Sequence, residues 1–187
     1  PLSEAQLDLF RLCTGRESYT GRGFAEVTVI SGARSGKDSR IAAPIVVYES
    51  CFGGHEKVLS RGERGVIPLV AQDQRATRIA YNYVKDYFTG SEVLRSMLEE
   101  PPNSMEIKLR NGLSVFCFPC TKGSLRGWSI PIAVLDELGF YRLEGSPDSD
   151  IEIQTSVRRG MINFANPKLL KISTPYMRSG VLFSDFK

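Results

Sequence analysis

Residues 31–38, Ser-Gly-Ala-Arg-Ser-Gly-Lys-Asp, decide the fold, because they place two glycines and a lysine in one short turn. The turn follows the β-branched run 25–30, which predicts a buried strand, and precedes a predicted helix over 38–50 that Pro44 would kink. Backbone N–H groups and a helix N-terminus in this context bind phosphate, and Lys37 adds a positive charge for the β- and γ-phosphates. The stretch therefore predicts a phosphate-binding loop.

The loop departs from the common Walker A pattern at both ends. Ser31 stands where a glycine is usual, with Gly32 one position later, and Asp38 replaces the usual serine or threonine. A carboxylate oxygen can also coordinate magnesium, although it adds negative charge beside the phosphates. A glycine turn that happens to contain a lysine is the alternative. The residues predicted to bind ATP here are Gly32, Ala33, Arg34, Ser35, Gly36, Lys37, Asp38 and Ser39.

A second motif, Ile-Ala-Val-Leu-Asp-Glu at 132–137, has the Walker B form of an apolar strand that ends in two acids. Ligands of open α/β sheets bind at this carboxyl edge. We expect Asp136 to hold Mg²⁺, together with Asp38, and Glu137 to act as general base on the attacking water. Alone, the motif could equally be a strand end with helix-capping acids. Both motifs, in the expected order and on the expected elements, predict a P-loop ATPase that uses ATP and Mg²⁺.

The remaining pattern predicts a single α/β domain with a mostly parallel central sheet flanked by helices. Asn111-Gly112 is a strong hairpin signal and adds an antiparallel element between 105–109 and 113–118. Further strands are expected at 66–71, 130–135 and 169–173, and helices at 4–13, 73–88 and 151–161.

Composition excludes few classes of protein. Hydrophobic residues make up 42% and charged residues 24% of the 187, as in ordinary globular domains. No apolar run approaches the roughly 18 residues of a membrane span, so no membrane partner is expected. The net charge of +3 is compatible with nucleic acid but too small to imply it.

The four cysteines, at 13, 51, 117 and 120, allow three interpretations. Cys117 and Cys120 have C-x-x-C spacing, and Cys51 with His55 could complete a zinc site, but a second compact pair is missing. A redox pair would normally open a helix. We favour reduced structural thiols, which suit a cytoplasmic protein.

Two further segments carry polar groups that could act on a nucleotide. Ser173-Thr174-Pro175 ends a strand, which beside the acid-bearing strand could sense the γ-phosphate; a simple cap is the alternative. Arg126 lies on a Gly-flanked loop before Asp136 and could stabilise transition-state charge; an exposed surface arginine is the alternative.

Four segments together resemble the ATPase domain of large terminase subunits from tailed bacteriophages. They are SGARSGKD, LVAQDQRA, SLRGWSIPIAVLDELGFY and KISTPYMRSGVLF, and the resemblance runs from about residue 6 to 186. It implies an ASCE/RecA-like P-loop NTPase fold, with an extra strand between the two Walker strands.

The resemblance also implies roles for single residues. Lys37 and loop 32–38 would bind phosphates, Asp136 would bind Mg²⁺ and Glu137 would be catalytic. The remaining roles are a coupling motif at Ser173, Thr174 and Pro175, a finger acting in trans at Arg126, a phosphate-sensing arginine at Arg34 and an adenine contact at Gln6.

The implied partners are double-stranded DNA, a portal protein, a small terminase subunit and further copies in a pentameric ring, although the isolated domain could be monomeric. The implied location is the host cell cytoplasm, transiently at the portal vertex of a procapsid. The family's C-terminal RNase H-like nuclease is absent from these 187 residues, so this chain alone is not expected to cut DNA. A helicase-like P-loop translocase and a nucleotide-binding domain without turnover, which Asp38 suggests, are the alternatives.

Overall fold

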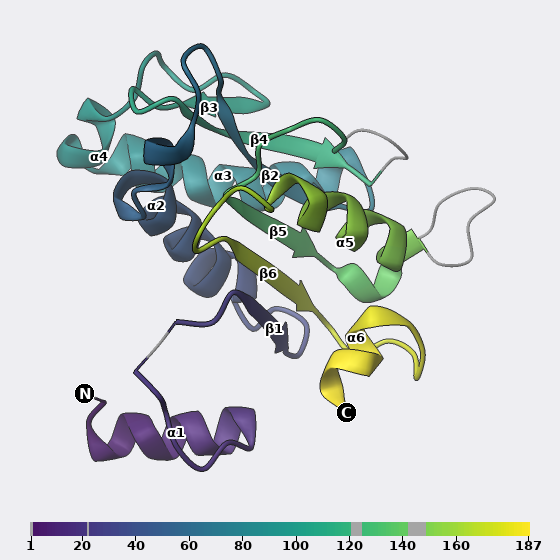
Figure 1. Ribbon diagram of the computed structural model, residues 1–187. Helices are drawn as coiled ribbons and strands as arrows, with labels where there is room; N and C mark the ends of the chain where they lie inside the picture. The colour runs from purple at the N-terminus through teal and green to yellow at the C-terminus, as the bar shows by residue number, and fades with distance from the viewer. Residues whose placement is uncertain (1, 22, 121–124, 142–148) are drawn as a thin grey trace.

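A six-stranded sheet forms the centre of the computed structural model, which describes residues 2–21, 23–120, 125–141 and 149–187 (Figure 1). The strand order is β1-β6-β5-β2-β4-β3, and only β3 is antiparallel to its neighbour. The strands are β1 (Glu26–Ile30), β2 (Gly65–Ala71), β3 (Glu106–Lys108), β4 (Leu113–Pro119), β5 (Ile132–Asp136) and β6 (Lys168–Ser173). This confirms the predicted α/β fold, the hairpin and the extra strand, because β6 separates β1 from β5.

Helices cover both faces of the sheet, and each face has its own apolar core. The helices are α1 (Glu4–Thr14), α2 (Ala43–Phe52), α3 (Gln74–Gly90), α4 (Glu92–Ser96), α5 (Ser149–Gly160) and α6 (Gly180–Phe186). One core joins α2 and α3 to the sheet, and the other joins α5 and α6 to it. Along β5, Val134 faces the first core and Ala133 and Leu135 face the second, as the two-residue period of a strand requires.

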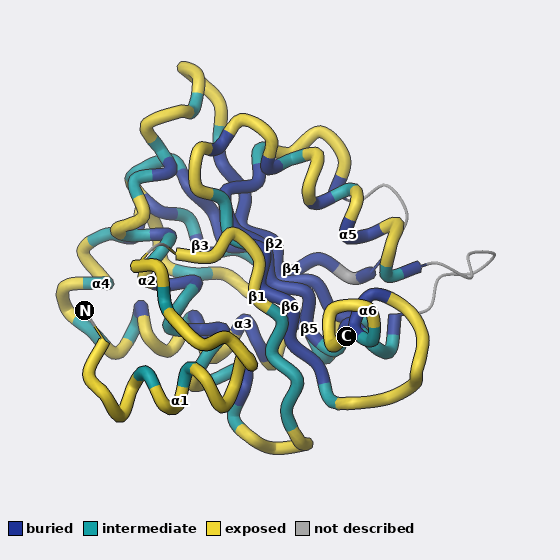
Figure 2. The backbone as a smooth tube through the Cα atoms, turned by 60° about the horizontal axis from the view of Figure 1, so that its bottom comes forward, coloured by how far each residue is buried: buried dark blue, intermediate teal, exposed yellow. Residues whose placement is uncertain are grey.

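Two local predictions needed correction. The helix expected at 38–50 begins instead as a π-helical turn, Lys37–Ala42, which continues into α2 with Pro44 in the first turn of the α-helix. Proline has no N–H, so it fits a first turn, where no intrahelical partner is required. Strand β1 was expected to be buried. It is an edge strand that pairs only with β6 among the described strands, and it has two exposed and three half-buried residues (Figure 2).

All four cysteines are free thiols, and two of them, Cys117 and Cys120, are buried. Cys117 belongs to the core under α2 and α3, whereas Cys120 belongs to the core under α5, so the two cannot share a metal ion or a disulfide without rearrangement. Burial raises the pKa of Cys117 to about 12 and that of Cys120 to about 11, which keeps both protonated. His55 instead contacts Glu49 at 2.8 Å.

No helix in the described ranges is long and apolar enough to cross a membrane.

Candidate nucleotide-binding and catalytic site

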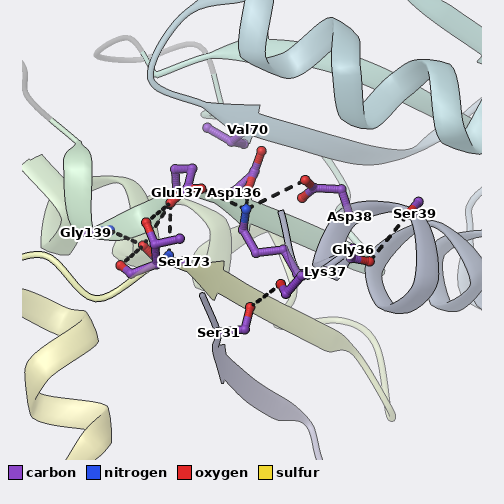
Figure 3. Close-up of polar contacts among 12 residues, drawn as sticks. Ser31, Gly36, Lys37, Asp38, Ser39, Val70, Asp136, Glu137, Gly139 and Ser173 are labelled. Carbon is purple, nitrogen blue, oxygen red and sulfur yellow. Dashed lines mark hydrogen bonds and ion pairs between the residues drawn. The ribbon is translucent and has the colours of Figure 1, made fainter. Parts of the chain in front are cut away.

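Three parallel strands end at the same edge of the sheet and bring the predicted motifs together (Figure 3). The loop predicted to bind phosphate, residues 31–36, follows β1. Asp136 and Glu137 end β5, and Ser173 ends β6. The Ser31 N–H donates to the carbonyl oxygen of Ser173 at 3.1 Å, which fixes the start of the loop to the central strand.

The loop is exposed and contains two residues with a left-handed backbone conformation. Arg34 has a φ of 57° and Gly36 a φ of 83°, and residues 32–35 are all exposed. A positive φ is uncommon for a residue other than glycine and is found at ligand-binding and active sites. The turn is closed by a contact between the Ser31 and Ser35 hydroxyls at 2.9 Å. The helical segment that starts at Lys37 follows directly, so the loop has the form that a phosphate group requires.

Lys37 lies at the centre of the site and contacts three carboxylates. Its side chain is only 9% exposed, and its Nζ lies 2.7 Å from Glu137 Oε1, 3.7 Å from Asp38 Oδ2 and 3.9 Å from Asp136 Oδ1. Burial opposes the charged form, but the hydrogen bond to Glu137 and the three negative charges hold the pKa of Lys37 above its ordinary value. One cation thus faces three acids, and this excess of acids favours a second cation.

Asp38 and Asp136 each have a buried oxygen atom that accepts no hydrogen bond from the described residues. Asp38 Oδ1 and Asp136 Oδ1 are the two buried side-chain oxygens without a hydrogen bond among the described residues. Burial, and then the charge of Asp38, raise the pKa of Asp136 to about 8 although Lys37 opposes the rise. Mg²⁺ prefers one or two carboxylates and takes its other oxygens from water and phosphate. The pair therefore fits Mg²⁺ bound together with a nucleotide, and no described group of three or more His, Cys, Asp or Glu side chains could hold a metal alone.

Glu137 is held in a strained conformation by the end of β6. Its φ is 52°, and its Oε2 accepts hydrogen bonds from the Thr174 N–H at 3.0 Å, the Thr174 hydroxyl at 3.1 Å and the Ser173 hydroxyl at 3.3 Å. Burial would raise its pKa, but hydrogen bonds from Lys37 and Thr174 hold the pKa of Glu137 below its ordinary value. The carboxylate is therefore ionised and can accept a proton.

The sequence did not predict the hydrogen bonds that Ser173 and Thr174 donate to Glu137. The order of motifs indicated that their strands are neighbours, but not that the Thr174 backbone binds the glutamate. Gly139 was missed as well. Its N–H donates to the Ser173 hydroxyl at 3.2 Å, and an added Cβ would lie 3.2 Å from that oxygen. A glycine two residues after the acidic pair was the available signal.

The remaining predicted residues lie around this centre or away from it. Ser39 donates to the Gly36 carbonyl at 3.4 Å, and Pro175 is exposed directly after Thr174. Arg126 is exposed and, within the described part of the chain, forms no hydrogen bond or ion pair; residues 121–124 just before it lie outside the described ranges. Gln6 on α1 accepts from the Ser3 N–H at 2.9 Å in a capping box. The roles of Arg126 and Gln6 stay predictions.

Replacing Asp38 with asparagine should stabilise the metal-free protein at alkaline pH. Above the unfolded pKa of 3.8 the unfolded chain releases the Asp136 proton, whereas the folded protein keeps it up to about pH 8. Stability therefore falls as pH rises through this window. Removing the neighbouring charge lowers the folded pKa of Asp136, and one unit of pKa corresponds to about 1.4 kcal/mol.

We compare the free energy of unfolding of Asp38→Asn with that of wild type. On this conversion, the difference should be about 1 kcal/mol more favourable to the variant at pH 8 than at pH 5. Urea unfolding without divalent metal, at both pH values, measures the difference. Asp86→Asn, at an exposed position of α3, is the matched control. Identical pH slopes for wild type and Asp38→Asn would show that the two carboxylates do not interact.

The strand order, the exposed loop after β1 and the acidic pair at the end of β5 define the fold of a P-loop NTPase. The chain is similar to the HK97 bacteriophage large terminase, with a TM-score of 0.60 and 16% identity over 92% of this chain and 33% of that one. It is also similar to the large terminase ATPase domain of Thermus phage P74-26, with a TM-score of 0.52 and 18% identity over 90% of this chain and 69% of that one. A mutant of that domain matches with a TM-score of 0.54 and 18% identity, over 92% of this chain and 71% of that one.

These similarities confirm that the fold is that of phage large terminase ATPase domains, as the sequence resemblance implied. The chain spans only about a third of the HK97 protein. No protein-family model matches the sequence, and neither does any curated protein.

Proposed function

We propose that this chain is the ATP-hydrolysing motor domain of a phage large terminase and drives duplex DNA into a procapsid. The observation that carries the proposal is the convergence of Lys37, Asp136, Glu137 and Thr174 at one sheet edge. The fold in which they converge is shared with the terminase ATPase domains.

Nucleotide binding would rearrange the ion pairs of the site. The exposed loop backbone and the Lys37 ammonium bind the triphosphate, so Lys37 moves its hydrogen bond from Glu137 to a phosphate oxygen. Asp38 and Asp136 would hold Mg²⁺, which would neutralise charge on the triphosphate. Glu137 Oε1 accepts a hydrogen bond from Lys37 Nζ at 2.7 Å in this structure, and nucleotide binding would release this oxygen.

The freed Glu137 oxygen then orients a water molecule. The water oxygen attacks the γ-phosphorus, the bond between that phosphorus and the oxygen bridging to the β-phosphate breaks, and the water proton passes to Glu137. ADP leaves with the bridging oxygen, and phosphate leaves with the new one. Ser173 and Thr174 keep Glu137 in position through its other oxygen.

The same two residues connect the chemistry to α6. The chain runs from Thr174 into α6, which is attached to the rest of the domain at both ends. The Val181 N–H donates to Asp150 at 2.6 Å, and Asp185 pairs with the buried Lys171 of β6 at 2.7 Å. A change in the hydrogen bonds of Glu137 would therefore be passed along residues 173–175 to α6 and, through these contacts, to α5 and β6. This is the coupling that we assign to Ser173, Thr174 and Pro175.

The assembled motor would be a pentameric ring on the portal protein, with the small terminase subunit delivering double-stranded DNA. In this ring, Arg126 of one subunit would stabilise transition-state charge at its neighbour. Its exposure permits this role, and so does the absence of hydrogen bonds and ion pairs to it among the described residues. The complex would act in the host cell cytoplasm, transiently at the portal vertex.

An assay with the full-length protein, procapsids and duplex DNA tests this function. Wild type should hydrolyse ATP and protect DNA from nuclease inside the capsid. Arg126→Ala should leave ATP affinity unchanged but lower turnover by about a thousandfold, the lower end of arginine-finger effects, in the assembled motor only. Strand separation would instead support a helicase-like translocase, and binding without turnover a nucleotide-dependent interaction domain. Weaker ATP binding by monomeric Arg126→Ala would contradict a role in trans.

A further inference from the structure

A buried lysine on β6 fastens the helix α6 to the sheet. Lys171 is only 2% exposed, and Leu169, on the same face of the strand, belongs to the core under α5. Strand β6 has a neighbouring strand on each side. Central parallel strands usually consist of apolar residues, because helices cover both of their faces. A charged side chain at this position therefore requires a specific reason.

Two carboxylates from different elements compensate the charge of Lys171. Its Nζ lies 2.7 Å from Asp185 Oδ2 on α6 and 3.1 Å from Glu26 Oε2 on β1. The Thr28 hydroxyl on β1 donates to the same Asp185 oxygen at 2.5 Å. Glu26 also pairs with Arg158 on α5, at 2.7 Å. The cluster thus joins β1, β6 and α5 to α6, and α6 enters it through Asp185.

Stability alone does not account for this cluster. Burial removes the hydration of a charge, and well-packed apolar residues commonly stabilise a core as much as a buried ion pair or more. A charge-assisted hydrogen bond is short and directional, and its energy depends on the distance between the charges. The pair of Lys171 and Asp185 therefore selects one position of α6 on the sheet, which apolar contacts alone would define less sharply.

Helix α6 borders the residues that hold the proposed catalytic base. Leu182 of α6 lies so close to Gly139 that an added Cβ there would be 3.1 Å from the leucine Cδ2. The Gly139 N–H donates to the Ser173 hydroxyl at 3.2 Å, and that hydroxyl donates to Glu137 Oε2 at 3.3 Å. Lys171 lies two residues before Ser173 on the same face of β6. A shift of α6 would therefore change the position of the Glu137 carboxylate.

We propose that Lys171 is a positioning residue for ATP hydrolysis, which holds α6 through Asp185 and thereby keeps Glu137 aligned with the attacking water. The proposal rests on the proposed function, because it requires Glu137 to act on water. Neither member of this ion pair belongs to loop 31–36 or to the proposed Mg²⁺ ligands. The pair should therefore affect turnover and leave nucleotide binding unchanged.

Steady-state hydrolysis of ATP with Mg²⁺ by full-length Asp185→Asn tests the proposal. Asparagine keeps the shape of the side chain and can still accept from Thr28, but it lacks the charge that pairs with Lys171. The Asp185 side chain is 25% exposed, so the variant should fold. We expect kcat to fall about tenfold, less than the roughly hundredfold that a misplacement of 1 Å can cost. KM and the equilibrium affinity for ATP should change by less than about twofold, because ground-state binding is retained.

Two further variants show which contact of the cluster matters. Arg158→Met is the matched control, because it removes one partner of Glu26 and leaves the pair with α6 in place. It should hydrolyse ATP at the wild-type rate. Lys171→Met should have the same lowered kcat as Asp185→Asn, and the double variant should fall no further, because both changes remove one interaction.

The outcomes distinguish this proposal from the proposed function. A normal kcat in folded Asp185→Asn would overturn the proposal, since the ion pair would then serve only stability. So would a raised KM with unchanged kcat, because the cluster would then act on nucleotide binding. An equal loss of kcat in Arg158→Met would contradict the role of α6, since any change in the cluster would then slow turnover. If wild type hydrolyses no ATP, the proposed function fails, and this proposal fails with it.

Discussion

Lys37→Ala should weaken the binding of ATP with Mg²⁺ by about a hundredfold or more, the equivalent of roughly 3 kcal/mol for a buried charged partner. Lys37 is the buried cation at the carboxyl edge of β1 and β5, and its Nζ lies among Asp38, Asp136 and Glu137. Without it, the triphosphate would meet three acids and no lysine. The loss therefore combines a missing attraction with an added repulsion.

Isothermal titration of purified wild type and variant measures this effect directly. Lys57→Ala, which removes an exposed lysine outside the site, should bind like wild type. Because three acids lose their cation, Lys37→Ala should also unfold at a lower temperature without ligand, so a folding check accompanies the titration. Retained ATP affinity in a folded variant would show that loop 31–36 does not bind phosphate.

Glu137→Gln should stop hydrolysis while leaving the nucleotide bound. A glutamine keeps the size of the side chain and can still accept the hydrogen bonds from Ser173 and Thr174, but it cannot take a proton from water. Loss of a general base lowers turnover by about 10²- to 10⁴-fold. ATP affinity should be equal to that of wild type or higher, because Lys37 no longer has to leave a charged partner at 2.7 Å.

Single-turnover hydrolysis and equilibrium binding, measured on the same preparation, separate the two parts of this result. Glu92→Gln, at an exposed position on α4, should behave as wild type in both measurements. Turnover by Glu137→Gln near the wild-type rate would assign the base to another residue. Weak binding with normal turnover would contradict the ion-pair exchange between Lys37 and Glu137.

Much of the fold could be predicted from local sequence patterns. The hairpin at Asn111-Gly112, the parallel strands and the helices on both faces depend on turn chemistry and periodicity within short stretches. Errors occurred where neighbours override local preference. Strand β1 has the composition of a buried strand but lies at the sheet edge, and the π-helical turn after Gly36 has no signal in the residue types. The short helix α6 was not predicted either.

The candidate site could likewise be predicted only in part from the sequence. The residue types and their order identified Lys37, Asp136, Glu137 and the Ser-Thr-Pro segment as candidates, because phosphate and magnesium require particular groups on particular elements. Their interactions could not be predicted, since each joins strands that are distant in the sequence. The hydrogen bonds from Thr174 to Glu137 and the raised pKa of Asp136 depend on distances of a few ångströms and on burial.

The sequence by itself thus determined the class of fold, the loop and the set of chemical groups, because these follow from local hydrogen bonding and side-chain chemistry. Only the tertiary structure decided which acid accepts the hydrogen bond of Lys37 and which buried carboxylate oxygens accept no hydrogen bond from the described residues. The physical reason is that electrostatic and packing interactions depend on separation in space, which the order of residues along the chain does not specify.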